Sequence, residues 1–158
     1  MDEKPILEIF LTILQEFEIG SFQEYYSTGT NGVMKEAMWQ HHFFHACWKF
    51  FPKKIHSEVG ACFGTRGSLD FYLDSTMQLG FELLREGNKI QQHIGRFSET
   101  DSPGKQIDMK DYLVVDFCTK TAPSMDINNS KYVRVYVSKD YGSAVVYYVG
   151  GSKTVIFK

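Results

Sequence analysis

One apolar run, residues 112–118 (YLVVDFC), limits the fold of this chain more than any other feature. A strand with one exposed face alternates apolar and polar residues, whereas a strand covered on both faces is a nearly continuous apolar run. A sheet that is covered on both faces needs helices or other chain on each side. We therefore expect an α/β domain with this run in the middle of its sheet.

The segments before this run predict two helices. Apolar residues at helical spacing indicate a first helix that starts at Ile6 and ends before Gly20. A second helix is expected over residues 33–51, with Pro52 ending it. The inward face of this second helix is expected to consist of Ala37, Phe44, Trp48 and Phe51.

Short apolar runs between glycine-rich or polar breaks predict the strands. Strands are expected over residues 55–62, 69–73, 79–84, 112–118, 132–137, 144–149 and 154–157, and a short helix over 88–97. Gly150-Gly151 predicts a hairpin between the last two strands. The order α-α-β-β-β-α-β-β-β-β has no internal repeat and no linker, so we expect one domain over residues 1–158.

Composition narrows the class of protein. The chain has 158 residues, 43% of them hydrophobic, and a formal net charge of −2. A nucleic-acid partner would need a local basic stripe, because neutralised phosphates supply most non-specific affinity. No apolar run approaches the ~20 residues of a membrane span, and residues 1–5 do not begin a signal peptide. Cys47, Cys62 and Cys118 are widely spaced, which favours buried thiols in a reducing compartment.

Two carboxylates, Asp70 in the strand LDFYL and Glu82 in the strand FELLR, are the strongest candidates for chemistry. A tight turn between adjacent antiparallel strands would bring them side by side, where they repel unless a cation or proton lies between them. Mg²⁺ prefers such oxygen ligands and can activate a water for attack on a phosphodiester. Both acids lie among apolar residues, where an unpaired carboxylate is costly. The alternative is a pair of solvated carboxylates at an edge strand.

A basic stripe is predicted just after Glu82. Arg85, Lys89, Gln92 and Arg96 recur at helical spacing and could contact phosphates. The alternative is the ordinary solvated face of a short helix. His93 lies in the same segment and could act as a general base.

Residues 67–97 (GSLDFYLDSTMQLGFELLREGNKIQQHIGRF) resemble a known family. The motifs DFY at 70–72, GFELLREG at 80–87 and H…RF at 93–97 are similar to the core of the restriction-endonuclease-like domain of Crinkler effectors, in the PD-(D/E)XK nuclease superfamily. Weaker similarity extends the match over about residues 33–137. The resemblance implies an αβββαβ core, here with an extra N-terminal helix and extra C-terminal strands in a mixed sheet.

The resemblance also implies roles for individual residues. Asp70 and Glu82 would bind Mg²⁺ or Mn²⁺, and Glu36 would be the acid of the first core helix. Arg85 would stand near the usual active-site lysine. Glu58, from the first strand, either extends the acidic cluster or has a structural role.

One position departs from the superfamily pattern. The basic residue normally lies two positions after the glutamate, where this chain has Leu84. Either the strand ends at Leu84 and Arg85 turns into the site, or Lys89 takes the role from the following helix. Arginine keeps its proton, so Arg85 could stabilise charge but is a poor general acid or base.

These observations predict a metal-dependent nuclease acting on DNA, or a catalytically inactive domain that binds host nuclear proteins or chromatin. The family resemblance implies a location in the nucleus or cytoplasm, including that of a host cell. The histidines of HHFFH offer a further alternative, since His41 and His45 lie one helical turn apart and could bind zinc. No third ligand is evident nearby, so we favour a structural role for them.

Overall fold

The computed structural model contains one mixed β-sheet and two helices among the residues that it describes, which confirms the expected α/β class. The described residues are 4–19, 36–59, 69–74, 76, 78–86, 109–119 and 129–158. The elements are α1 (Ile6–Leu14), α2 (Glu36–Phe50), β1 (Ile55–Val59), β2 (Leu69–Leu73), β3 (Leu79–Arg85), β4 (Asp111–Cys118), β5 (Tyr132–Val137), β6 (Ser143–Tyr148) and β7 (Gly151–Ile156).

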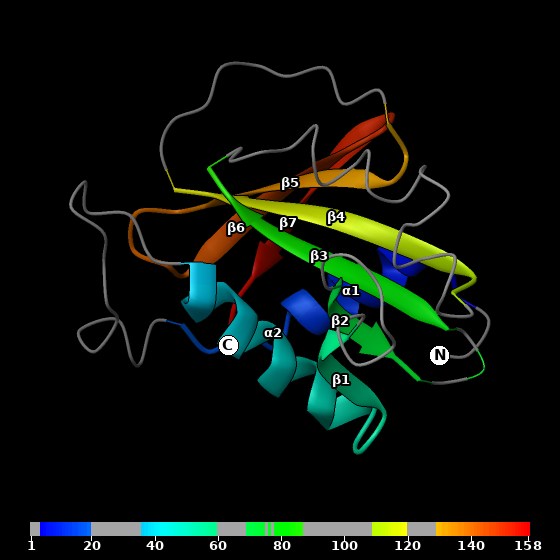
Figure 1. Ribbon diagram of the computed structural model, residues 1–158. Coiled ribbons are helices and arrows are strands. Elements are labelled where there is room, and N and C mark those ends of the chain that lie inside the picture. The colour runs from blue at the N-terminus through cyan, green and yellow to red at the C-terminus, as the bar shows by residue number, and fades with distance from the viewer. Residues whose placement is uncertain are drawn as a thin grey trace.

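The strands lie in the sheet in the order of the sequence, from β1 to β7 (Figure 1). Strands β1, β2 and β3 form an antiparallel meander, and β5, β6 and β7 form another. Between the two meanders, β4 runs parallel to both β3 and β5. The expected final hairpin is confirmed, although its turn is Val149-Gly150 and Gly151 already pairs with Tyr148. Gly150 has a φ of 89°, which an L side chain rarely adopts.

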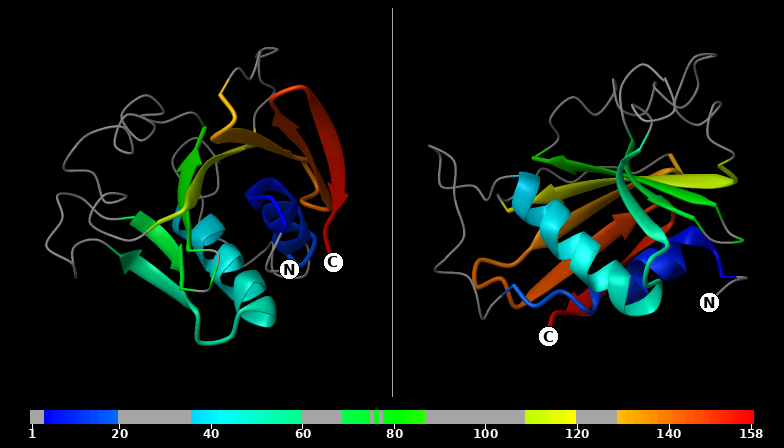
Figure 2. Two further views of the ribbon diagram at one scale, coloured as in Figure 1. Left: turned by 90° about the vertical axis from the view of Figure 1, so that its right-hand side faces the viewer. Right: turned by 60° about the horizontal axis from the view of Figure 1, so that its bottom comes forward.

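Both described helices lie inside the curve of the sheet, so they cover the same face (Figure 2). We call this face the helix face. Alternate residues of the strands, among them Phe81, Leu83, Val115 and Phe117, point to it and join one large apolar core with the helices. The other residues of each strand, among them Glu82, Leu84, Val114, Asp116 and Arg134, define the opposite face, which we call the far face.

The middle strands are buried on both faces, as the apolar run of residues 112–118 predicts. Six consecutive residues of β4, from Leu113 to Cys118, are buried, and so are six of β3, from Leu79 to Leu84. At the margin of the sheet, β6 alternates buried and more exposed residues, because only its helix face is covered. The last strand, β7, is exposed except for Val155.

The inward face of α2 differs from the prediction. Of the expected residues, Phe51 is buried and Phe44 is partly buried against the core, whereas Trp48 is 42% exposed and Ala37 is also exposed. The buried side of the helix is made instead by Trp39, Phe43, Ala46 and Cys47. Trp39 stacks on Phe117 of β4 with ring centroids 4.7 Å apart, which fixes the rotation of the helix. Apolar residues occur on nearly every side of this helix, so spacing alone could not select the buried stripe.

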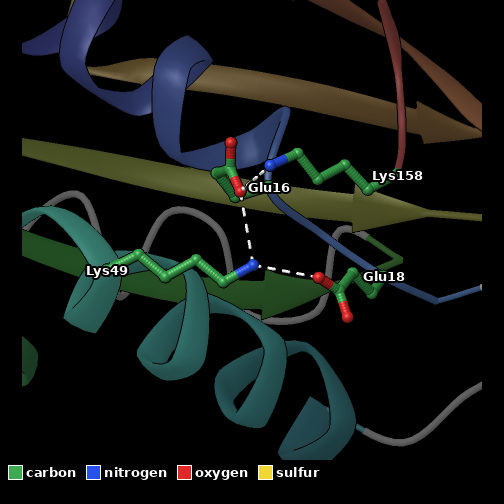
Figure 3. Close-up of polar contacts among 4 residues, drawn as sticks. All are labelled: Glu16, Glu18, Lys49 and Lys158. Carbon is green, nitrogen blue, oxygen red and sulfur yellow. Dashed lines mark hydrogen bonds and ion pairs between the residues drawn. The ribbon is translucent and has the colours of Figure 1, made fainter.

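Four charged residues at the surface, of which Glu16 is partly buried and the other three are exposed, join the helices to the C-terminus (Figure 3). Lys158 lies 2.5 Å from Glu16, and Lys49 of α2 contacts Glu16 at 3.3 Å and Glu18 at 3.0 Å. The Lys158 backbone N–H also donates to the Phe17 carbonyl. The end of the chain is thereby attached to the segment that follows α1.

Candidate active site

The structure brings Asp70 and Glu82 together through reciprocal hydrogen bonds. The regular pairing of β2 with β3 runs from Leu73 opposite Leu79 to Phe71 opposite Phe81. One residue further, Glu82 Oε2 accepts a hydrogen bond from the Asp70 backbone N–H at 3.2 Å. Asp70 Oδ2 accepts one from the Leu83 backbone N–H at 2.8 Å. Each carboxylate therefore binds the backbone of the other strand, where the regular ladder stops.

Burial makes these contacts necessary. Glu82 is only 1% exposed, and Asp70 is partly buried. A buried carboxylate is costly unless donors or charges compensate it, and a backbone N–H that leaves its ladder also needs an acceptor. The two hydrogen bonds satisfy both requirements and use one oxygen of each carboxylate. The alternative of two solvated edge carboxylates is therefore wrong for Glu82.

An open hollow of about 360 Å³ lies beside Asp70. Its walls come from three elements: Ala37, Gln40, His41 and Phe44 of α2, Ser57 of β1, and Asp70 and Phe71 of β2. A water takes about 30 Å³ in the liquid, so the hollow has room for a hydrated ion and a phosphate group. Asp70 thus lines an opening to solvent, whereas Glu82 is buried and is not among the residues that line the hollow.

Glu36 and Glu58 are placed only by their backbones. Glu36 is the first residue of α2, next to Ala37 in the wall of the hollow. Glu58 follows Ser57 in β1, which also lines the hollow. Their side chains lie outside the described part of the structure. Their roles as assisting acids stay predictions.

Arg85 does not turn into the site at the end of β3. The strand continues through Arg85, which lies opposite Phe117 of β4, so the alternative in which it ends at Leu84 is wrong. Strand alternation directs Arg85 away from the face of Glu82. The strand ends at Arg85. The next residue, Glu86, has a φ of 53°, and its carboxylate accepts hydrogen bonds of 2.7 Å from the Thr119 N–H and hydroxyl.

The other residues of the predicted stripe lie outside the described residues. These are Lys89, Gln92 and Arg96, together with His93. Leu84, at the position of the superfamily's basic residue, is buried against Val114 and Tyr132 on the far face. A basic residue at that position would lose its water, which is unfavourable without a partner.

A buried polar cluster lies on the far face. Asp116 pairs with Arg134 of β5, whose Nε lies 3.2 Å from Asp116 Oδ2. The Tyr132 hydroxyl donates to the same oxygen at 2.8 Å. Burial, followed by the Asp116 carboxylate, raises the pKa of Tyr132. Only the register of the parallel strands reveals Arg134, since it places residues 116 and 134 opposite one another.

The histidines of α2 have separate environments. The rings of His41 and His45 lie 4.4 Å apart on the exposed side of the helix. His42 is buried against Phe17, and burial followed by repulsion from His41 lowers its pKa to about 4. In the described part of the chain, no three or more His, Cys, Asp or Glu side chains are grouped so as to hold a metal ion.

No protein-family model, curated protein or solved structure matches this chain. The resemblance to the Crinkler nuclease-like domain therefore stays a prediction based on the motifs of residues 67–97. Across the described segments, no helix combines the length and apolar character that crossing a bilayer requires.

Proposed function

We propose that this protein is a metal-dependent nuclease of the PD-(D/E)XK type that hydrolyses phosphodiester bonds in DNA. The observation that carries the proposal is the reciprocal pairing of Asp70 and Glu82, on neighbouring strands, beside a hollow that reaches solvent.

The topology supports the same proposal. A helix, α2, is followed by the antiparallel strands β1, β2 and β3, and then by β4, which is parallel to β3. This order and these directions agree with an αβββαβ core, whose second helix, expected over residues 88–97, lies outside the described residues. Parallel neighbours need a crossover of a dozen or more residues, and residues 86–110 are long enough to supply it.

The two acids fit a hard divalent ion such as Mg²⁺ or Mn²⁺, because carboxylate oxygens are its preferred protein ligands. Asp70 and Glu82 would hold the ion, with Glu36 or Glu58 assisting. When bound, such an ion lowers the pKa of a water and neutralises charge on the phosphodiester. The backbone N–H groups of Asp70 and Leu83 keep the two carboxylates in place before substrate arrives. Lys89, Gln92 and Arg96 of the predicted stripe would hold substrate phosphates, whereas Arg85 is directed to the other face of the sheet.

The test is cleavage of supercoiled plasmid DNA with Mg²⁺ or Mn²⁺ and with EDTA. Asp70→Asn and Glu82→Gln should each lower the cleavage rate at least about 100-fold, since the charge that holds the ion is lost. Asp74→Asn is the matched control, because Asp74 lies just beyond β2 and its side chain is 68% exposed. It should cleave at the wild-type rate.

Three results would count against the nuclease. These are metal-independent cleavage, cleavage that persists in both site variants, and no cleavage by a folded wild-type protein. Folding of each variant is checked by circular dichroism, because Glu82 is buried.

A second candidate is an inactive nuclease-like domain that binds host nuclear proteins or chromatin. Leu84 favours this candidate, because it is a buried apolar residue at the position where the superfamily has a basic one. The neighbouring Arg85 does not replace that basic residue, since it points to the other face of the sheet. This candidate predicts no cleavage, together with binding to reconstituted nucleosomes that survives Asp70→Asn. If the wild-type protein does not bind nucleosomes, chromatin is not its partner.

A further inference from the structure

Two histidines of α2, His41 and His45, form a pair beside the hollow. Their ring centroids lie 4.4 Å apart and the rings are tilted by 54°. Residues four positions apart are neighbours on one side of a helix, which places one imidazole a turn beyond the other. Both residues are exposed, so packing into the core does not account for the pair. The nitrogens of both rings can therefore be reached by a small ion.

The spacing of the two rings suits a shared metal ion. Zinc binds imidazole nitrogens at ~2.0–2.1 Å in tetrahedral geometry, so two such nitrogens on one ion lie about 3.3 Å apart. The nitrogens are at the ring edges, and exposed side chains turn easily between rotamers. Rings with centroids 4.4 Å apart can thus direct one nitrogen each toward a single ion. Zinc-dependent proteases use the same spacing of two histidines on a helix.

The chemistry of the pair favours a transition metal over magnesium. Partial burial, followed by repulsion from His45, lowers the pKa of His41, so this ring is uncharged near neutral pH. A histidine must be uncharged to bind a metal. Imidazole nitrogens suit zinc, copper and nickel, whereas Mg²⁺ prefers oxygen ligands. The pair therefore differs in metal preference from the two acids, Asp70 and Glu82.

The hollow gives the ion an open side. His41 lines the hollow together with Asp70, which is the one charged residue among the described residues of its wall. Within the described ranges, no group of three or more possible metal ligands is present, so the pair would supply two ligands. The remaining positions of the ion would be filled by water or by an anionic oxygen. Open positions of this kind are typical of zinc that meets a ligand, whereas structural zinc has four protein ligands.

We propose that His41 and His45 bind a divalent transition-metal ion such as Zn²⁺ at the wall of the hollow. This site is additional to the magnesium site proposed for the acids, and it does not depend on nuclease activity. The bound ion would place positive charge on the wall that α2 contributes to the hollow.

The experiment is isothermal titration calorimetry of the full chain, without an affinity tag, using ZnCl₂ as the ligand. The wild type should bind one Zn²⁺ per chain. His41→Gln and His45→Gln should each weaken binding at least about 10-fold, because one of two protein ligands is lost. Excess Mg²⁺ should leave the zinc affinity unchanged, since the pair offers no oxygen ligand.

Two further variants serve as controls. His56→Gln removes a histidine of β1 whose side chain is 50% exposed, and it should bind zinc as the wild type does. Asp70→Asn removes the carboxylate that lines the hollow and should also keep the zinc affinity. Circular dichroism checks that each variant is folded.

Each outcome decides for or against the pair. Loss of zinc affinity in both His41→Gln and His45→Gln, with affinity retained in both controls, would support the site whatever the plasmid assay gives. No zinc binding by the wild type, or a loss in only one of the two pair variants, would overturn it. A loss in Asp70→Asn would also overturn it, because the zinc would then belong to the acids, and a loss in His56→Gln would assign the zinc to β1.

Discussion

The two faces of the central strands are both buried, but by different kinds of contact. On the helix face, aromatic and aliphatic side chains fill the space against α1 and α2, as Phe43 does between Phe71 and Phe81 at 5.0 Å from each. On the far face, a small apolar group of Leu84, Val114 and Tyr132 lies among buried charged residues. Apolar packing is non-directional, whereas each buried charge needs a particular partner. The helix face therefore provides most of the stability, and the far face holds groups that can do chemistry.

The largest expected effect is on the helix face. Trp39→Ala should lower the free energy of unfolding by about 3–5 kcal/mol, because the indole is fully buried and leaves a cavity against Phe117. Trp48→Ala on the same helix should cost less than about 1 kcal/mol, since Trp48 is 42% exposed. Urea denaturation of the two variants measures the difference. Equal losses would show that the buried side of α2 is wrongly assigned.

The second prediction concerns the charge pair of the far face. Asp116→Leu alone should cost about 3 kcal/mol, because it leaves the Arg134 guanidinium buried without its carboxylate. The double variant Asp116→Leu with Arg134→Met should be close to the wild type, since no charge is stranded. A thermodynamic cycle from urea denaturation tests this coupling. Simple additivity of the two single losses would show that the pair is not a unit.

The third prediction is a pH dependence from the helix side. Burial lowers the pKa of His42 from 6.5 to about 4, so the unfolded chain takes up a proton at a higher pH than the folded protein does. Stability should be complete above pH 6.5 and fall by up to about 3 kcal/mol as the pH drops to 4.

His42→Leu isolates this contribution. Between pH 6.5 and about 5, the stability of this variant should change much less with pH than that of the wild type. This range lies above the pH at which carboxylates ordinarily titrate. His45→Gln, at an exposed position of the same helix, should keep the slope. Thermal unfolding at half-unit pH steps provides the comparison, and a slope that survives in His42→Leu would assign it to another group.

The smallest effect is expected at the exposed ion pairs of the helix side. The hydrogen bond from Lys158 lowers the pKa of Glu16, so this contribution is present above pH 4.5 and is lost as the pH falls below it. Lys158→Met should lower Tm by less than about 3 °C, because solvent screens such pairs. The shift should shrink further in 0.5 M salt. A shift that salt does not change would point to lost packing of the lysine stem.

The sequence predicted the strands well because their signals are local. The covered strand at 112–118 and the hairpin near Gly150 follow from residue types over a few positions, and the boundaries agree within three residues. The apolar stripe of α2 was predicted only in part. Phe51 is buried and Phe44 partly buried as expected, but Trp48 is exposed, because it satisfies helical spacing as well as the buried Trp39 and Phe43 do. Only packing against Phe117, Phe71 and Phe81 decides between the two stripes.

The candidate site was predicted in part. Asp70 and Glu82 lie on adjacent strands joined by a short connection, so their proximity follows from the alternation of residues and the turn. The hydrogen bonds of the two carboxylates to backbone N–H groups could not be predicted from the sequence, because they depend on where the regular pairing of β2 with β3 stops. Arg134 was missed as the partner of Asp116 because the two residues are 18 positions apart and meet only through parallel pairing.

The sequence by itself determined which residues form strands, that one strand is covered on both faces, and which two acids share a strand pair. The tertiary structure decided which side of α2 is buried and that Arg134 pairs with Asp116. It also decided that Arg85 points to the face of the sheet opposite to that of Glu82. The physical reason is range: propensity and alternation act over a few residues, whereas helix rotation and strand register are set by packing between segments distant in the chain.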